Sequence, residues 1–289
     1  MALTKAEWLD LEGKAAEVRQ LTLDICNWAG SAHMGGSLSA TDFLTILYYK
    51  YLNFDPKDYE NPDRDRCIVS KGHIGVCIAA LFSLLGLIPR EDLKTFNLTG
   101  SRLGIHLDYH KVNGLECSTG SLGHGSALGL GEALAARVMG KSFKTWVLLG
   151  DGECDEGSVW EAAMATASFK ATNLITVVDR NHCMIDGNTE DVMKLEPFAD
   201  KWRAFGFEVF EVNGHDMNAM SEAIEKAMAV TEKPACIILD TVKGEGISFM
   251  AGDYKWHYGA MDAEKYELAT NDLKAYAAKR AERAQKEGK

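Results

Sequence analysis

The clearest hydrophobic pattern in the chain predicts a strand, a helix and a second strand. Residues 146–149 form an apolar run, and residues 174–178 form a second run that is rich in β-branched side chains. Between the two runs, Ser158 and Glu161 have the spacing of a capping box, and an alanine-rich segment with helical spacing follows as far as Lys170. The connection of such a unit is nearly always right-handed, so we expect two parallel strands that end at the same edge of a sheet.

Polar side chains follow both of these strands. Gly150-Asp151-Gly152 comes directly after the first strand, and Asn181 comes after the second. A carboxylate, an amide oxygen and a nearby backbone carbonyl would form an incomplete oxygen shell for Mg²⁺, with phosphate and water supplying the rest. The two glycines allow a tight turn and the close approach of a diphosphate. The pattern therefore predicts a metal diphosphate site, although Gly-Asp-Gly taken alone also occurs as an ordinary turn.

The same alternation of strands and helices continues along the rest of the chain. Further helices are predicted over residues 4–28, 40–52, 122–138, 216–230 and 263–289, with one more between His73 and Leu85, and further strands over 67–69, 207–212 and 235–242. Thr4 and Glu7 cap the first helix and Gly30 ends it. This order predicts an α/β fold with a mainly parallel sheet flanked by helices, in one domain over residues 1–289.

Three segments rich in small residues carry histidines. Residues 31–39 contain His33, and His73 lies at a turn from a strand into a helix, where the helix dipole favours anions. Residues 101–125 have too many glycines for a helix or long strand, and loops of this length are usually functional or disordered. Each histidine also has an ordinary interpretation, His33 as part of a helix connection and His73 as a helix cap.

Composition narrows the class of partner and the compartment. The chain has 31 basic and 42 acidic residues, a net charge of −11, which argues against nucleic acid or an anionic membrane surface as a partner. Its seven cysteines include no CxxC pair, so neither a disulfide framework nor a zinc site is indicated. The N-terminus lacks the apolar region of a secretion signal, and no run of about eighteen apolar residues occurs. We expect a cytoplasmic protein.

Gly150-Asp151-Gly152 with Asn181 thirty positions later resembles the thiamine diphosphate motif, and in particular that of the transketolase family. Four further segments carry the resemblance over nearly the whole chain. They are the H-x-G-x-x-L sequence at 33–38, S-x-G-H at 70–73, the glycine-rich residues 114–125, and T-x-x-G-x-G-x-S with a later histidine at 241–257. The resemblance implies a thiamine diphosphate-binding fold, and specifically its diphosphate-binding domain.

The resemblance also implies roles for individual residues. The metal ion, Mg²⁺ or alternatively Ca²⁺ or Mn²⁺, would be bound by Asp151, Asn181 and the carbonyl of Cys183. Donor sugar would contact His33, His106 and His257. The residues that the resemblance assigns to thiamine diphosphate are His73, Gly120, Ser121, Leu122, Gly150, Gly152, Glu153, Asn181, Ile185 and His257, with the backbone of 120–122 lying against the aminopyrimidine ring. Glu156 and Glu161 match acidic residues that link paired active sites across a dimer.

The sequence departs from the family pattern at a few of these motifs. Asn113 and Leu107 stand where the family has proline, and His124 stands where it has glutamine. Tyr258 separates His257 from the following glycine. In the family, the glutamate that activates the cofactor belongs to a second, pyrimidine-binding domain, and no segment of this chain resembles that domain. We therefore expect a partner subunit that carries it, with two copies of each chain.

The resemblance implies a transketolase that moves a two-carbon ketol unit from a ketose to an aldose, with sugars or sugar phosphates as substrates, and that is active only with its partner. Two alternatives stay open. One is a subunit of another thiamine diphosphate enzyme, such as a deoxyxylulose-phosphate synthase or a 2-oxoacid dehydrogenase. The other is a non-catalytic homologue that binds the cofactor.

Overall fold

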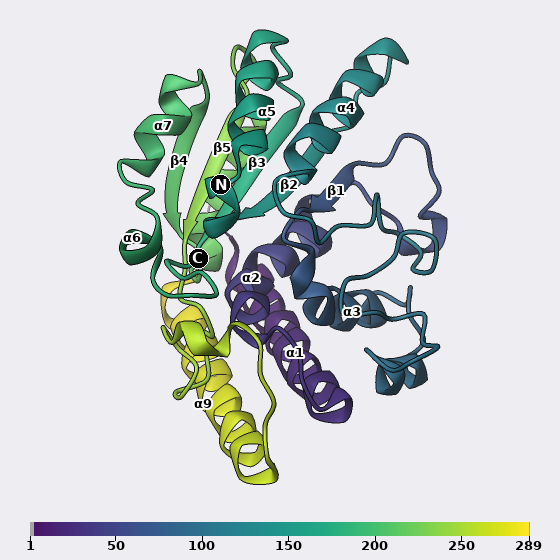
Figure 1. Ribbon diagram of the computed structural model, residues 1–289, viewed down its shortest axis with the longest axis vertical. Coiled ribbons are helices and arrows are strands. Elements are labelled where there is room, and N and C mark those ends of the chain that lie inside the picture. The colour runs from purple at the N-terminus through teal and green to yellow at the C-terminus, as the bar shows by residue number, and fades with distance from the viewer. Residues whose placement is uncertain (1–2, 289) are drawn as a thin grey trace.

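The fold is built on a parallel sheet, seen here in a computed structural model that describes residues 3–288. Within these residues the sheet has five strands, β1 (Arg66–Val69), β2 (Thr145–Gly150), β3 (Leu174–Arg180), β4 (Glu208–Asn213) and β5 (Ala235–Asp240). Their order is β1-β2-β3-β5-β4, and every neighbouring pair is parallel (Figure 1). The predicted α/β class with a mainly parallel sheet is confirmed.

Helices cover both faces of the sheet. The longer ones are α1 (Lys5–Ala29), α2 (Met34–Ile46), α3 (Gly75–Leu84), α4 (Gly125–Val138), α5 (Gly157–Ser168), α8 (Met217–Met228) and α9 (Ala263–Glu287), and the shorter ones are α6 (Thr189–Val192) and α7 (Phe198–Ala204). Side chains of α1, α2, α3 and α8 share one core with one face of the sheet, and those of α4, α5 and α7 share a second core with the other face. The result is a three-layer arrangement around a central sheet.

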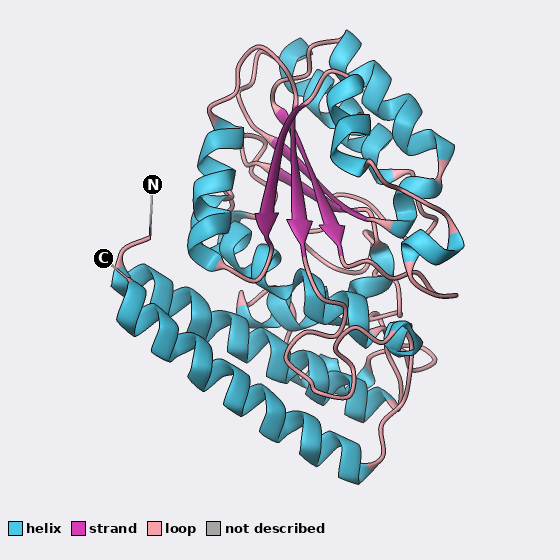
Figure 2. Ribbon diagram, turned by 90° about the vertical axis from the view of Figure 1, so that its left-hand side faces the viewer, coloured by secondary structure: helices cyan, strands magenta, loops and turns pink. Residues whose placement is uncertain are grey.

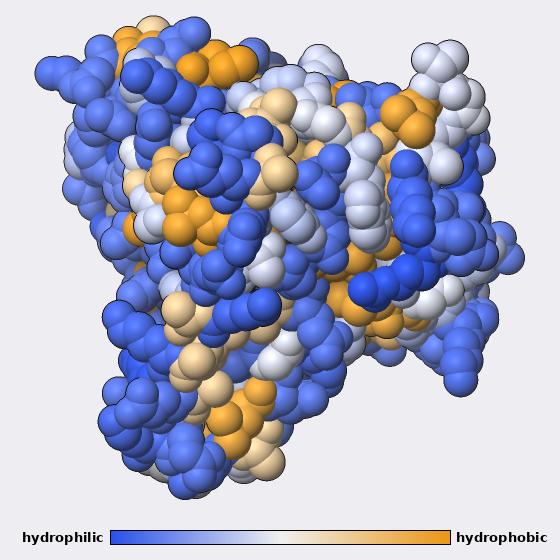
Figure 3. Space-filling model, turned by 90° about the horizontal axis from the view of Figure 1, so that it is seen from below, coloured by the Kyte–Doolittle hydropathy of each residue, from blue (hydrophilic) through white to orange (hydrophobic). Residues whose placement is uncertain are grey.

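Alternation along the strands produces these two cores. In β2, Trp146 and Leu148 face the core of α1 to α3, whereas Val147 and Leu149 face the core of α4 and α5. The long helix α9 packs along α1 and adds Ala269, Leu273 and Ala284 to the first core (Figures 1 and 2). Seen from below, the molecule is mostly hydrophilic, with its apolar side chains in separate groups (Figure 3). None of the helices within residues 3–288 is both long and apolar enough to cross a membrane.

The strand register brings the carboxyl ends of β2, β3 and β5 to one edge of the sheet. Gly150 pairs with Asp179, and Arg180 pairs with Asp240. The residues that follow β2 and β3, Asp151 and Asn181, are therefore neighbours, as the parallel arrangement predicts. Figure 2 shows the strand arrows pointing together toward the helices below the sheet.

Several helix boundaries differ from the sequence prediction. The first helix has its predicted caps, because Thr4 and Glu7 form a capping box and Gly30 has φ of 81°. The capping box predicted at Ser158 is wrong, since α5 begins at Gly157 without a side-chain cap and the Ser158 hydroxyl donates to the carbonyl of Gly123. The helix predicted from residue 40 already begins at Met34. The short helices α6 and α7 carry little hydrophobic pattern and were not predicted.

Candidate functional site

A cavity of about 290 Å³ lies at the carboxyl ends of the central strands. The start of α2, the turns after β1, β2 and β3, the glycine-rich loop before α4 and the segment after β5 surround it. Predicted site residues that line the cavity are His33, His73, His106, Gly120, Leu122, Gly150, Asp151, Gly152, Glu153, Asn181, Cys183, Ile185 and His257. The structure therefore brings together in one place residues spread over more than two hundred positions of sequence.

Four histidines form one side of this cavity. The ring of His33 lies 5.3 Å from that of His73, 5.9 Å from that of His106 and 5.2 Å from that of His257, measured between centroids. The rings of His73 and His257 stack at 5.0 Å. The four rings come from three predicted motifs and from the loop that contains His106, so the histidine cluster exists only in the folded chain.

Burial keeps these histidines neutral. It lowers the pKa of His33 to about 4, with further lowering by His106 and Lys243, and it lowers the pKa of His257 to about 3, with help from Lys243. Burial likewise lowers the pKa of His73 and of His106. Neutral imidazoles can both donate and accept protons, which suits contacts with sugar hydroxyls. Within the described chain, the buried Nδ1 of His33 has no hydrogen-bond partner, which favours a ligand at that atom.

The predicted metal ligands lie on the turns that follow β2 and β3. Asp151 Oδ2 accepts the backbone N–H of His182 at 2.7 Å and the guanidinium of Arg180 at 3.1 Å. Asn181 Oδ1 accepts the N–H of Cys183 at 3.2 Å, which shapes the turn whose carbonyl was predicted as the third ligand. The two side chains and the carbonyl are thus held on adjoining turns at one sheet edge.

Asp151 is electrostatically prepared for a cation. Burial raises the pKa of its carboxyl, and the neighbouring carboxylate of Asp179 raises it further, while Arg180 opposes the shift. A bound cation would relieve the cost of this buried charge. No group of three or more His, Cys, Asp or Glu side chains within residues 3–288 is arranged to hold a metal by itself.

Glu153 connects three of the segments that surround the cavity through hydrogen bonds. Its carboxylate accepts hydrogen bonds from the Ser70 hydroxyl, from Gly123 N–H at 2.8 Å and from Gly150 N–H at 3.0 Å. Burial raises the pKa of Glu153, and these hydrogen bonds oppose the shift. The side chain lines the cavity as predicted, but both of its oxygens are engaged with protein donors. Its placement favours a role in joining three turns.

Two lysines that sequence reasoning did not select also line the cavity. Lys71 and Lys243 are 1% and 2% exposed. The ammonium of Lys71 forms an ion pair with Asp179 and donates to the carbonyl of Gly36 at 3.1 Å. Both lysines directly adjoin glycines inside predicted motifs, at S-K-G-H and at V-K-G-E-G. A lysine within a glycine-rich turn that follows a buried strand is the sequence feature that could have identified both residues as site residues.

Three of the predicted residues lie outside the cavity. Ser121 is exposed, and it does not line the cavity as Gly120 and Leu122 do. Glu156 and Glu161 are exposed on and just before α5. The interface role of Glu156 and Glu161 therefore stays a prediction.

The structure shows the surroundings of two residues that depart from the family pattern, Tyr258 and Leu107. Tyr258 packs against His33 with ring centroids 4.8 Å apart, and its hydroxyl lies 2.6 Å from the hydroxyl of Ser31. Tyr258 thus contacts the histidine cluster, although it does not line the cavity itself. Leu107, next to His106, is buried at 5% exposure, so an apolar contact replaces the rigidity that proline would provide.

The residues present fit a metal diphosphate ligand. The cavity offers an oxygen set for a hard cation, two buried ammonium groups for an anion, and an imidazole nitrogen without a partner. Its volume is at the lower end of the roughly 300 to 1,000 Å³ that is usual for small-molecule sites, which suits a site that holds only part of its ligand.

Comparison with known proteins points in the same direction. Residues 12–280 match the family described as transketolase, thiamine diphosphate binding domain. The chain is 40% identical to an apulose-4-phosphate transketolase subunit of Phocaeicola vulgatus over 280 residues, which cover 96% of this chain and 97% of that protein. It is 38% identical to the 6-deoxy-6-sulfo-D-fructose transketolase subunit SqwG of Clostridium sp. (strain MSTE9), with 92% and 96% covered.

Solved structures of longer proteins share the fold. The transketolase from Leishmania mexicana superposes with a TM-score of 0.86 at 27% identity, covering 96% of this chain and 45% of that one. The transketolase from Pichia stipitis in complex with sedoheptulose-7-phosphate gives a TM-score of 0.84 at 28% identity, with the same coverage. The chain therefore spans less than half the length of these solved proteins.

Proposed function

The chain belongs to the transketolase family, and from that premise we propose that it is the diphosphate-binding subunit of a two-chain transketolase. The pair would transfer a two-carbon ketol unit from a ketose to an aldose. The observation that carries this proposal is that Asp151, Asn181 and Cys183 line the same cavity as four histidines whose pKa values are lowered by burial. The end-to-end match to relatives named as separate subunits supports the two-chain arrangement.

Thiamine diphosphate is the proposed cofactor, held through Mg²⁺, Ca²⁺ or Mn²⁺. Asp151, Asn181 and the Cys183 carbonyl would bind the metal, with diphosphate oxygens completing its shell. The cofactor's surroundings would comprise His73, Gly120, Ser121, Leu122, Gly150, Gly152, Glu153, Ile185 and His257. When bound, thiamine diphosphate supplies the carbanion chemistry on which ketol transfer depends.

The histidines would position the donor sugar and exchange its protons. His33, His106 and His257 are proposed to contact donor hydroxyls, because their neutral rings offer both a donor and an acceptor nitrogen. His257 Nδ1 accepts a hydrogen bond from the Lys243 ammonium at 3.0 Å, so its proton is placed on Nε2. The free nitrogen of His33 gives a second contact point.

The proposed partner is a subunit that carries the pyrimidine-binding domain. It would supply the glutamate that protonates the aminopyrimidine and would cover the open side of the cofactor. Two copies of each chain are proposed, with Glu156 and Glu161 near the contact between paired sites. Residues 1–289 would form the single diphosphate-binding domain. A reducing compartment such as the cytoplasm would suit the seven cysteines, all of which are free thiols.

Reconstitution tests this function. The chain is produced alone and together with the product of a neighbouring reading frame that carries the pyrimidine-binding domain. Transfer to an aldose is measured with phosphorylated, sulfonated and unmodified ketoses, the first two being sugar types that relatives' names mention. We expect transfer by the pair and none by either chain alone.

The control is the same pair with Asp151→Asn, which should assemble to the same mass and transfer nothing. Activity of the chain without any partner would contradict the two-subunit proposal. A correctly assembled pair that transfers no ketol unit from any donor of the panel would contradict the transketolase activity.

A further inference from the structure

Two segments far apart in sequence form an antiparallel bridge beside the histidine cluster. Ala32 N–H donates to the carbonyl of Gly259 at 3.1 Å, and Gly259 N–H donates to the carbonyl of Ala32 at the same distance. Because these two residues exchange both hydrogen bonds, Tyr258 lies directly opposite His33. Side chains of such an opposing pair project to the same side and contact each other. The bridge therefore places a tyrosine against a histidine that is proposed to contact the donor sugar.

Tyr258 contacts His33 through its ring and Ser31 through its hydroxyl. The ring centroids of Tyr258 and His33 are 4.8 Å apart, with the planes at 61°. The hydroxyl of Tyr258 lies 2.6 Å from that of Ser31, so one of the two donates to the other. Ser31 is the diagonal neighbour of Tyr258 across the bridge, which is within reach of a long side chain. The phenol ring is thus fixed beside His33 both by its backbone and by its hydroxyl.

His33 has few restraints on its own side chain. It is the N-cap residue of α2, but its side chain forms no capping hydrogen bond. Its buried Nδ1 has no hydrogen-bond partner within residues 3–288. Its other ring neighbours are imidazoles of the cavity, at 5.2 to 5.9 Å, from His73, His106 and His257. Packing against Tyr258 therefore has a large share in setting the orientation of the His33 ring.

The contact is a feature of this chain that the family motif does not specify. Tyr258 stands between His257 and Gly259, where the family pattern has a glycine directly after the histidine. Resting on the proposed function, we propose that Tyr258 is a positioning residue for His33. Together with Ser31 it holds the His33 ring in the orientation that meets the donor sugar, and it shields that ring from water. Tyr258 does not line the cavity, so it acts on the donor through His33.

Removing the Tyr258 ring should change the protonation of His33. Burial is the main cause that lowers the pKa of His33 to about 4, with further lowering by His106 and Lys243. With water admitted beside the ring, this pKa should rise toward its ordinary value of about 6.5. The other titratable side chains that face His33, those of His73 and His257, stay in place. A tyrosine that merely supports the fold would lower stability without moving this pKa.

Three substitutions separate the ring from the hydroxyl. Tyr258→Ala removes both, Tyr258→Phe keeps the ring without the hydroxyl, and Ser31→Ala removes the partner hydroxyl. Tyr109→Phe, at a half-exposed tyrosine outside the cavity, is the control for the loss of a phenol hydroxyl.

One measurement needs no activity, and a second one uses the reconstituted pair. Nuclear magnetic resonance titration of the imidazole signals of the full chain gives the pKa of His33, whose signal is identified by its loss in His33→Asn. Steady-state kinetics of the pair give kcat and KM for the donor and for the acceptor. Calorimetric titration gives the affinity for thiamine diphosphate with Mg²⁺.

We expect the pKa of His33 to rise by about one unit or more in Tyr258→Ala and to change little in Tyr258→Phe. Donor kcat/KM should fall by about 10-fold or more in Tyr258→Ala, because a contact group is misplaced. Tyr258→Phe and Ser31→Ala should each lower it by about 2- to 10-fold, and the double variant should be no worse, because both remove the same hydrogen bond. Acceptor KM and cofactor affinity should stay within about twofold of the unaltered values.

An unchanged pKa of His33 together with an unchanged donor kcat/KM in Tyr258→Ala would overturn the positioning role. So would a loss of cofactor affinity in Tyr258→Phe as large as its loss of donor kcat/KM, because that result would show a general disturbance of the cavity. An unaltered pair that transfers no ketol unit would instead overturn the proposed function. The titration of the chain alone would then still decide whether Tyr258 shields His33.

Discussion

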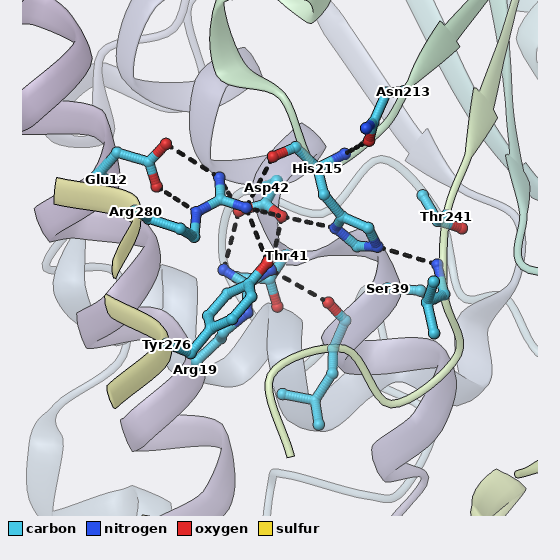
Figure 4. Close-up of polar contacts among 12 residues, drawn as sticks. Glu12, Arg19, Ser39, Thr41, Asp42, Asn213, His215, Thr241, Tyr276 and Arg280 are labelled. Atoms are coloured by element: carbon cyan, nitrogen blue, oxygen red, sulfur yellow. Dashed lines mark hydrogen bonds and ion pairs between the residues drawn. The ribbon is translucent and has the colours of Figure 1, made fainter. Parts of the chain in front are cut away.

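Asp42 and Asp151 are both almost completely buried, yet their surroundings have opposite electrostatic character. Asp42 belongs to a charge cluster made of Glu12, Arg19, Asp42, His215 and Arg280 (Figure 4). Although burial alone would raise the pKa of Asp42, Arg19 and Arg280 hold it well below its ordinary value. Burial and Asp179 raise the pKa of Asp151. Asp42 is paired with two arginines, whereas Asp151 has one arginine, Arg180, and also the like charge of Asp179 beside it.

The difference shows which buried charges serve the fold and which await a ligand. In the charge cluster every acid is matched by an arginine, and the cluster ties together α1, α2, α9 and the turn before α8. In the cavity, Lys71 has Asp179 as its counterion, but Lys243 forms no ion pair within residues 3–288. The pKa of Asp151 is raised, and Nδ1 of His33 has no hydrogen-bond partner in the described chain. A structure tolerates such groups where binding supplies the missing charge.

The two regions are in contact through His215. Its Nδ1 lies 2.9 Å from Asp42 Oδ2, and its Nε2 accepts the N–H of Val242 at 2.9 Å. Val242 directly precedes Lys243 in sequence. The charge cluster therefore helps to fix the segment that carries Lys243.

The largest effect on stability is expected from Asp42→Asn. The substitution keeps the shape of the side chain but leaves Arg19 and Arg280 buried without their shared carboxylate, and we expect a loss of about 3 to 5 kcal/mol in the free energy of unfolding. Urea denaturation measures this loss. Asp10→Asn, which breaks an exposed helix pair with Lys14, is the control, with an expected change of about 0.5 kcal/mol or less. A loss below about 1 kcal/mol at Asp42 would mean that the cluster does not support the fold.

The matched substitution in the cavity, Asp151→Asn, should have little effect on stability and a large effect on cofactor binding. Arg180 keeps its ion pairs with Glu190 and Glu196, so we expect the free energy of unfolding to change by about 1 kcal/mol or less. Affinity for thiamine diphosphate with Mg²⁺ should fall by about 100-fold or more, because a metal ligand is lost. Calorimetric titration measures the affinity. Cofactor binding equal to that of the unaltered chain would remove Asp151 from the metal site.

A smaller effect concerns the pH dependence of stability. His33 and His257 have folded pKa values of about 4 and 3, below the ordinary value of about 6.5, so the unfolded chain binds more protons between these limits. The contribution of these neutral rings to the free energy of unfolding is fully present above about pH 6.5. It is lost as the pH falls toward about 4 for His33 and about 3 for His257. Each contributes at most about 1.4 kcal/mol per pH unit, and less here because the rings are partly exposed.

Thermal unfolding of the chain from pH 7 to pH 3 measures this dependence. His33→Asn should flatten the curve between pH 6.5 and 4, and the exposed His110→Asn should leave its slope unchanged. The charge cluster should respond only at lower pH, because the stability supplied by Asp42 is lost as the pH falls below the ordinary carboxyl value of about 4. A curve that stays the same in His33→Asn would show that the cavity histidines do not titrate on unfolding.

Much of the site follows from local patterns. Apolar runs ending at Asp151 and at Asn181 predict strands, and parallel pairing of adjacent strands places their ends together. The glycines of 33–38 indicate a close approach, which turns out to be that of Lys243 over Gly35 and of His73 and Lys71 over Gly36. Ser158 shows the limit of this reasoning. Its spacing to Glu161 predicts a hydrogen bond that caps its own helix, but in the folded chain its hydroxyl donates to the carbonyl of Gly123 instead.

The order of residues along the chain was enough to establish the α/β class, the motif positions and the convergence of Asp151 with Asn181, because strand pairing and helix spacing act over short distances. How the buried charges are shared became visible only in the folded molecule. The partners of Asp42 lie on α1, α9 and the turn before α8, and those of Lys243 lie about sixty and fourteen positions away. No local hydrophobic pattern predicts these long-range contacts, because they depend on how the layers of the fold pack and on which charged side chains become buried as a result.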